Sequence, residues 1–204
     1  MNAFAHPPGF RPAFALFVLA LVLGFALGGC GDDDENPMKP APGGPTYPNL
    51  SHPASVLAAY ELAYSSRDTT MGKALFDPTY TGSSVDLNHP GSDLSFTYDD
   101  EIAHMRALAI TPGLSAYLDL GPDVTWDRLP SDDPSHPEWA VLLISGFAYR
   151  IEITEGVETW GAIGEAGTFQ EFAFTPTLDS TSPTDTLWKI VRWRETGRSD
   201  SPVP

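Results

Sequence analysis

The spacing of the apolar residues changes part-way along this chain, and the change limits the folds open to it. Over residues 51–110 the apolar residues recur at helical spacing, whereas after Pro112 they alternate with a period of two. Helices followed by strands, without regular alternation of the two, predict an α+β domain. We expect three N-terminal helices followed by antiparallel strands.

The three expected helices have recognisable starts or ends. The first carries Val56, Tyr60 and Tyr64 on one face and has a proline in its first turn. The second is predicted over residues 68–76, where an Asp-Pro dipeptide ends it. The third begins at the capping-box sequence formed by Thr97 and Asp100 and ends near residues 111–113. Asp100 therefore has a structural role before any chemical one.

Five strands are predicted after the helices. The clearest is a single strand over residues 139–154, whose first half reads as buried on both faces. Turn-rich segments are expected at residues 156–167 and 178–185. The other predicted strands cover residues 114–120, 124–128, 168–175 and 187–195.

The order of these elements resembles a known superfamily. A long first helix with paired tyrosines, a short second helix, a capped third helix and a last strand reading Leu-Trp-Lys-Ile-Val-Arg-Trp over residues 187–193 are similar to nuclear transport factor two-like or ketosteroid isomerase-like proteins. The resemblance covers residues 51–195. It implies three N-terminal helices packed in a curved antiparallel sheet, which forms a cone-shaped domain with an open mouth and a pocket. It does not imply one activity, because isomerases, dehydratases, cyclases, ligand carriers and assembly modules share this fold.

The N-terminal segment predicts a lipoprotein. Residues 13–27 are uncharged and apolar but too short to span a bilayer core, as in a secretory signal peptide. They end in Leu27-Gly28-Gly29-Cys30, which resembles the lipobox of bacterial lipoproteins. Cys30 is the only cysteine, so it has no disulfide partner within the chain. We expect residues 1–29 to be removed and Cys30 to anchor the protein on a membrane through its lipid.

A linker is predicted at residues 30–50, a folded domain at 51–196 and a disordered tail at 197–204. The linker is rich in proline and contains an acidic run over residues 32–35, which we interpret as a solvated spacer rather than a cation site. The position after Cys30 is Gly31 rather than aspartate, and by the lipoprotein resemblance this favours the outer membrane. We therefore expect the protein in the bacterial cell envelope.

The charge balance excludes one class of partner. The chain has 11 lysines and arginines against 27 aspartates and glutamates, for a formal charge of -16. This is the wrong sign for neutralising phosphates, so no nucleic-acid partner is expected. Hydrophobic residues make up 42% of the chain, which is enough for a folded core.

Candidate catalytic residues are few and each has a structural alternative. Tyr60 or Tyr64 could donate a hydrogen bond inside the cone while Asp119 acts as a base, but tyrosines on an apolar stripe are ordinarily core residues. His104 lies four residues after Asp100 and could form an Asp-His pair with it, whereas Asp100 is also the expected cap.

The remaining candidates concern binding. The acidic and histidine residues of the loop at 132–138 suggest either a divalent-cation site or a solvated loop, and the second interpretation is favoured. Arg192 and Arg194 are expected to face solvent or neighbouring carboxylates. No cofactor or metal ion is expected. The residues that we expect to line a pocket, unless they serve only as core and cross-strand partners, are Tyr60, Tyr64, Trp160 and Trp193.

Three functions remain open on the sequence alone. The favoured one is a lipid-anchored envelope protein whose domain binds a small apolar ligand or an envelope protein without catalysis. The second is an isomerase or dehydratase with a carboxylate or histidine base in the cone. The third is a structural module that forms a homodimer.

Overall fold

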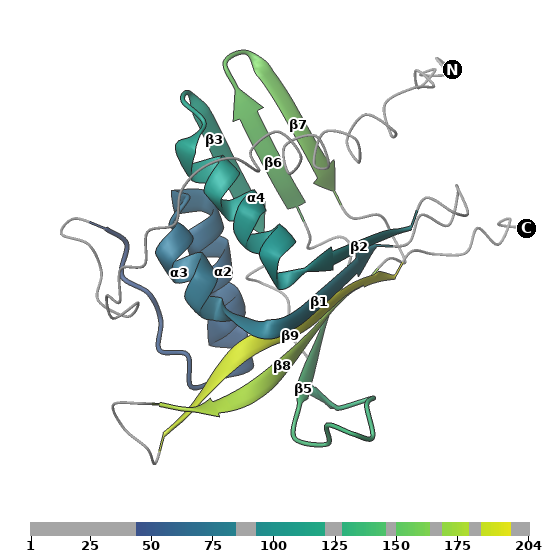
Figure 1. Ribbon diagram of the computed structural model, residues 1–204. Helices are drawn as coiled ribbons and strands as arrows, with labels where there is room; N and C mark the ends of the chain where they lie inside the picture. The colour runs from purple at the N-terminus through teal and green to yellow at the C-terminus, as the bar shows by residue number, and fades with distance from the viewer. Residues whose placement is uncertain are drawn as a thin grey trace, which may run out of the picture.

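The computed structural model describes residues 44–84, 93–120, 128–145, 150–163, 169–179 and 185–196. The predicted signal peptide, Cys30, most of the linker, most of the strand predicted over residues 124–128 and the C-terminal tail lie outside these residues. Within them the protein is α+β, with three helices packed on one side of a large curved sheet, as the sequence predicts (Figure 1). No helix in this part of the chain is long and apolar enough to cross a membrane.

The three helices begin and end close to the predicted residues. Helix α2 (Pro53–Ser66) follows His52, whose ring Nδ1 accepts from the backbone N–H of Ala54 at 3.1 Å. Helix α3 (Thr69–Leu75) is capped by the side chain of Asp68. Helix α4 (Tyr98–Ile110) begins with the predicted capping box. Local capping chemistry therefore fixes all three starts.

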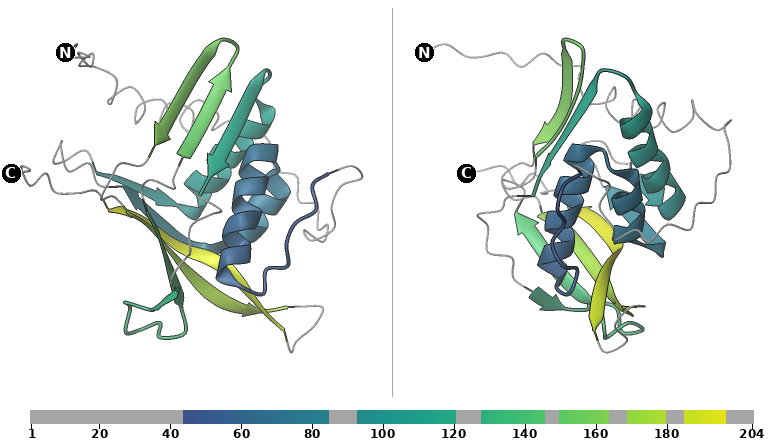
Figure 2. Two further views of the ribbon diagram at one scale, coloured as in Figure 1. Left: turned by 180° about the vertical axis from the view of Figure 1, so that it is seen from behind. Right: turned by 90° about the vertical axis from the view of Figure 1, so that its left-hand side faces the viewer.

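The strands form two sheets (Figures 1 and 2). The larger has the order β2-β1-β9-β8-β5-β4, and the smaller has the order β3-β6-β7. Strand β1 pairs with β9 in parallel, and the other pairings are antiparallel. The bounds are β1 Phe76–Ser84, β2 Leu94–Thr97, β3 Leu114–Asp119, β4 Arg128–Pro130, β5 Ala140–Ser145, β6 Arg150–Glu155, β7 Glu158–Ile163, β8 Phe169–Leu178 and β9 Thr186–Thr196.

One strand prediction is wrong, one predicted turn segment contains a strand, and one strand was not predicted. The segment 139–154 is two strands in different sheets, because β5 pairs with β8 while β6 pairs with β3 and β7. The segment 156–167 contains β7, which a two-residue turn at Gly156 and Val157 joins to β6. Strand β1 was not predicted, since its Pro78 normally argues against a strand. A register shift against β9 between Phe76 and Thr81 accommodates that proline.

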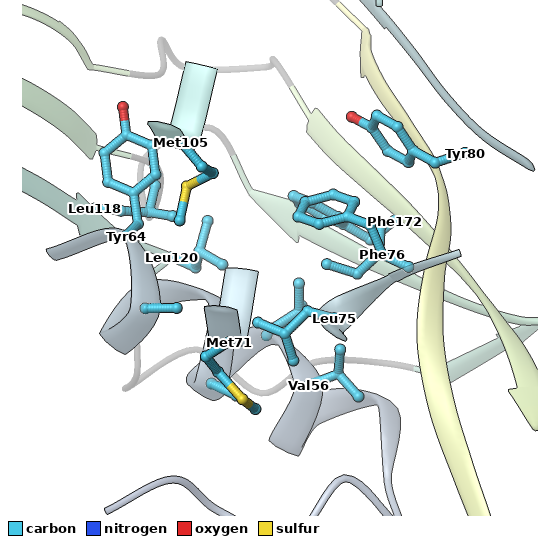
Figure 3. Packing of buried hydrophobic residues seen from close by; sticks show 14 of the residues in the cluster. Val56, Tyr64, Met71, Leu75, Phe76, Tyr80, Met105, Leu118, Leu120 and Phe172 are labelled. Atoms are coloured by element: carbon cyan, nitrogen blue, oxygen red, sulfur yellow. The ribbon is translucent and has the colours of Figure 1, made fainter. Parts of the chain in front are cut away.

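The hydrophobic core fills the space between the helices and both sheets (Figure 3). Tyr64 from α2, Met105 from α4 and Phe174 from β8 are fully buried in it. A smaller cluster made of Val141, Ala173 and Val191 packs with Trp139. The first half of the 139–154 segment is buried on both faces, as predicted, because alternate residues of β5 contribute to each cluster.

Candidate functional site

Two tyrosines on α2 meet two titratable side chains on α4. Tyr60 and Tyr64 are one helical turn apart and point the same way. The Tyr60 hydroxyl donates to Glu101 Oε1 at 3.0 Å, and the Tyr64 hydroxyl lies 3.1 Å from His104 Nε2. We call these four residues the α2–α4 cluster.

Glu101 is the acid of this cluster. Burial raises its pKa to about 7, the hydrogen bond from Tyr60 lowers it, and the charge of Asp100 raises it further. The phenol of Tyr60 is held by edge-to-face contacts with Tyr64 and with Phe76, at centroid separations of 6.1 and 5.2 Å. A carboxyl group that titrates near neutral pH can act as either an acid or a base.

His104 is neutral at physiological pH. Burial lowers its pKa to about 4, so the imidazolium form is disfavoured. Its Nδ1 is buried and makes no hydrogen bond to the described part of the chain. Its ring lies against that of Tyr64, with centroids 5.6 Å apart. The histidine therefore offers a hydrogen-bonding nitrogen rather than a charge.

A second feature lies on a different face of α2, where the helix meets β3. A surface hollow of about 460 Å³ opens there. Its apolar part comes from α2, from β3 and from the extended chain that precedes α2. The lining residues are Pro48, Ala58, Glu61, Leu62, Ser65, Tyr117, Leu118 and Asp119.

Side chains of α2 also bond to backbone N–H groups at the edge of β3 beside this hollow. Ser65 Oγ accepts from the backbone N–H of Leu118 at 3.2 Å, and Glu61 Oε1 accepts from the N–H of Leu120. Glu61 and Ser65 are one helical turn apart, so their spacing on α2 allows them to reach alternate residues of the chain along β3. These side chains take the place of a neighbouring strand.

The hollow is acidic. Burial raises the pKa of Glu61, the Leu120 N–H lowers it, and the charge of Asp119 raises it. Asp119 Oδ2 accepts from the Tyr117 hydroxyl at 3.1 Å. Two carboxyl groups at one small hollow favour a ligand that brings positive charge or several N–H donors.

The structure separates several residues that the sequence grouped as one site. Asp119 lies at the hollow, on a different face of α2 from Tyr60. Asp100 accepts from the backbone and hydroxyl of Thr97 in the capping box. His104 forms its hydrogen bond with Tyr64 of α2, so its partner in the structure is this tyrosine and not Asp100.

The two candidate tryptophans lie on strands. Trp193 on β9 packs against the core and donates through Nε1 to Gln170 Oε1 at 2.6 Å. Trp160 lies on β7, where its backbone is opposite Ile153. The structure therefore brings together Tyr60, Tyr64 and His104 among the predicted site residues.

Glu101 and Glu61 were missed by the sequence analysis. Glu101 precedes His104 by three residues, which places both on one face of α4, and this Glu-x-x-His spacing was the available signal. Glu61 had no comparable signal, because its partner is a backbone N–H some sixty positions away in the chain.

The acidic loop before β5 is tied to the arginines of β9. Asp132 accepts from Arg192, and from Arg194 at 2.9 Å. Asp133 accepts from the backbone of Ser135, and His136 lies 3.1 Å from Glu138. Both arginines also contact Glu171, so they do face carboxylates. In the described segments no three His, Cys, Asp or Glu side chains are grouped to hold a metal ion.

The sequence matches no family model and no curated protein. Solved structures with similar folds are NTF2-like and ketosteroid isomerase-like proteins. A ketosteroid isomerase-like protein from Erwinia carotovora atroseptica is 14% identical over 72% of this chain and 93% of its own, with a TM-score of 0.41. An NTF2-like protein of unknown function from Pseudomonas putida is 9% identical, over 75% of this chain and 89% of its own, with a TM-score of 0.40. An NTF2-like protein with a cystatin-like fold from Novosphingobium aromaticivorans is 14% identical, over 72% of this chain and 80% of its own, with a TM-score of 0.39.

Proposed function

We propose that this protein is a lipid-anchored protein of the bacterial cell envelope whose domain binds a small ligand in the α2–β3 hollow without converting it. The observation that carries the proposal is the hollow itself. It offers about 460 Å³ between a helix and a strand, with apolar side chains beside two carboxyl groups. Ligand sites typically combine an apolar lining with a few polar groups that orient the ligand.

The lining defines the chemical class of the ligand. Ala58, Leu62 and Leu118 suit an apolar body, while Glu61 and Asp119 suit an ammonium or amidinium group. An anionic ligand is disfavoured by both carboxyl groups and by the net charge of the chain. We therefore propose a small amphipathic cation.

The envelope location is supported by the sequence before the domain. The lipobox-like residues 27–30 precede a proline-rich segment, and residues 44–50 approach α2 without regular secondary structure. The Leu50 carbonyl accepts from the backbone N–H of Trp188 at 2.9 Å, so the folded domain begins just before α2. A tether of this length allows the hollow to face solvent away from a lipid surface.

Thermal denaturation with paired ligands tests the binding proposal. Aliphatic and aromatic amines are compared with carboxylates of the same carbon skeleton. An amine at a hundredfold excess over its Kd is expected to stabilise the fold by about 2.7 kcal/mol, and the matching carboxylate is not. Asp119→Asn should weaken binding by roughly tenfold, as expected for loss of one charge-assisted contact.

Asp133→Asn is the matched control, because Asp133 is on the loop before β5 and does not line the hollow. Mass spectrometry of the recovered ligand completes the test. Equal shifts with amines and carboxylates, or no effect of Asp119→Asn, would contradict the assigned site. Chemical conversion of the ligand would contradict binding without turnover.

One observation favours a second function, proton transfer of the isomerase or dehydratase type. Glu101 pairs with the Tyr60 hydroxyl and has a pKa of about 7, which suits a group that gives and takes a proton at neutral pH. For an enzyme of this kind, Glu101→Gln is expected to lower the turnover rate by about 10² to 10⁴ while the fold is kept. If Glu101→Gln converts a ligand at the wild-type rate, Glu101 is not the group that transfers the proton; if the wild type converts none of the ligands, this second function is contradicted.

A further inference from the structure

Three of the four sheet edges in the described part of the chain are protected. Strand β2 has only four residues, and β4 has only three and ends at Pro130. The N–H groups of Leu118 and Leu120 along β3 bond to Ser65 and Glu61 of α2. Short strands, proline and covering side chains are the usual protections against edge-to-edge pairing.

The fourth edge, that of β7, has none of these protections. It has six residues, Glu158–Ile163, without proline or lysine. Its one ladder among the described residues is with β6, on its inner side. Figure 2 shows β7 on the side of the smaller sheet away from the helices. A second strand can therefore approach this edge without meeting α2 or α4.

The hairpin turn determines which backbone groups point outward. Glu155 pairs with Glu158 across the two-residue turn, so these two residues form the closing hydrogen-bonded pair. Hydrogen-bonded and non-bonded pairs then alternate along the ladder. The outward N–H and C=O groups of β7 are therefore those of Thr159, Gly161 and Ile163.

We propose that this edge pairs with β7 of a second copy of the chain, antiparallel and about a two-fold axis through Gly161. The two three-stranded sheets then join into one continuous sheet across the dimer. In this register Gly161 is opposite Gly161 of the second copy, and Thr159 is opposite Ile163. At every such pair the outward N–H and C=O groups of one β7 strand face the outward groups of the other, as an antiparallel ladder requires. The arrangement is closed, so it stops at two copies.

The charges of the hairpin favour a second copy over a basic peptide. Residues 159–163 are Thr-Trp-Gly-Ala-Ile and carry no charge, so a cationic strand finds no carboxylate along them. Two copies pair this uncharged stretch with itself. Glu155 and Glu158 lie at the hairpin tip, and antiparallel pairing sends the two tips to opposite ends of the joined sheet. Like charges are thus kept apart.

Cysteine cross-linking tests this register. The full chain carrying Cys30→Ser is purified, so that an introduced cysteine is the only thiol. Gly161→Cys is expected to form a disulfide-linked dimer on oxidation, because the paired Cα atoms would lie at about 5.5 Å. Thr159→Cys is the matched control, and its thiols would be too far apart. Cross-linking should be at least about tenfold greater at position 161.

A second variant measures the association without a thiol. Gly161→Pro removes an outward N–H, which an edge strand tolerates, and is expected to abolish the dimer in sedimentation velocity. Gly161→Ala keeps that N–H and should keep the dimer. Circular dichroism checks that both variants remain folded. Equal cross-linking at positions 159 and 161, a dimer that survives Gly161→Pro, or a wild-type chain that is monomeric at about 1 mM would overturn the proposal.

Discussion

Glu101 holds its proton to a higher pH in the folded chain than in an exposed position, because burial disfavours its charged form. Its pKa rises from 4.5 to about 7. The folded state therefore binds more protons than the unfolded state in this window, and the contribution of Glu101 to stability falls as the pH rises through it. Above about pH 7 the cost of the buried carboxylate is fully present.

The variant Glu101→Gln tests this directly. The amide oxygen can still accept from Tyr60 but has no charge to desolvate, so we expect the variant to be more stable than the wild type at pH 8 by roughly 2 kcal/mol. At pH 4 the two should be nearly equal. Urea denaturation at both pH values measures the difference, and equal stability at pH 8 would show that Glu101 is solvated.

His104 acts in the opposite direction. Its pKa falls from 6.5 to about 4, so the unfolded state binds the extra proton between these values. Stability from His104 is fully present above pH 6.5 and is lost as the pH falls toward 4. The two α4 residues therefore oppose each other in the mildly acidic range, and only variants of one or the other separate their effects.

Arg67 connects three elements at the end of α2. It adopts a left-handed backbone conformation with φ 58°, which ends the helix. Its Nη1 donates to Leu114 O at 2.7 Å and to Thr111 O at 3.3 Å, and it lies 3.4 Å from Leu108 O. One side chain thus satisfies carbonyls at the end of α4 and the start of β3.

Arg67→Ala is expected to lower the free energy of unfolding by about 1 to 3 kcal/mol, because carbonyls that are now bonded to a cation lose their partner. Arg106→Ala is the matched control, since Arg106 is an exposed arginine of α4. Chemical denaturation of both variants gives the comparison. A similar loss in both would show that the effect comes from net charge rather than from the bridge.

The elements that were predicted well are those whose signals are local. The capping box at Thr97 and Asp100 needs only four adjacent residues, and the helix start follows from it. The break inside 139–154 needs knowledge of which strands pair, and the apolar alternation continues through it because both β5 and β6 have a buried side. The parallel pairing of β1 with β9 is likewise invisible in the order of elements.

The same distinction applies to the candidate sites. The spacing of Tyr60 and Tyr64 indicated a shared face, and that face does meet α4. Which residue each tyrosine would meet depended on the packing of α2 against α4. The pattern placed Asp119 on a strand after residue 112, as the structure does, but it could not show that Asp119 lies at the hollow and not beside these tyrosines. The hollow that Glu61 and Asp119 line could not be predicted from the sequence, because it depends on how α2 packs against β3.

At the scale of the whole molecule, the proposed lipid anchor at Cys30 is the feature most open to test. Cys30→Ser is expected to abolish labelling by radioactive fatty acid and to move the protein from the membrane fraction to the soluble fraction. The physical reason is that acyl chains contribute about 0.8 kcal/mol per buried methylene, and the described domain has no membrane-spanning helix. A serine variant that stays with membranes would place the anchor elsewhere. Gly31→Ala serves as the neighbouring control.

The position of β9 in the large sheet determines when that sheet can form during synthesis of the chain. β9 is the last of the strands in the described part of the chain, yet it lies between β1 and β8 and joins β1 to the rest of the large sheet. Phe76 pairs with Ile190, so this contact closes a loop of more than a hundred residues. The sheet cannot be completed until the C-terminal residues are available. A nascent chain therefore cannot complete the large sheet until the residues of β9 have been synthesised, although its other strands precede them.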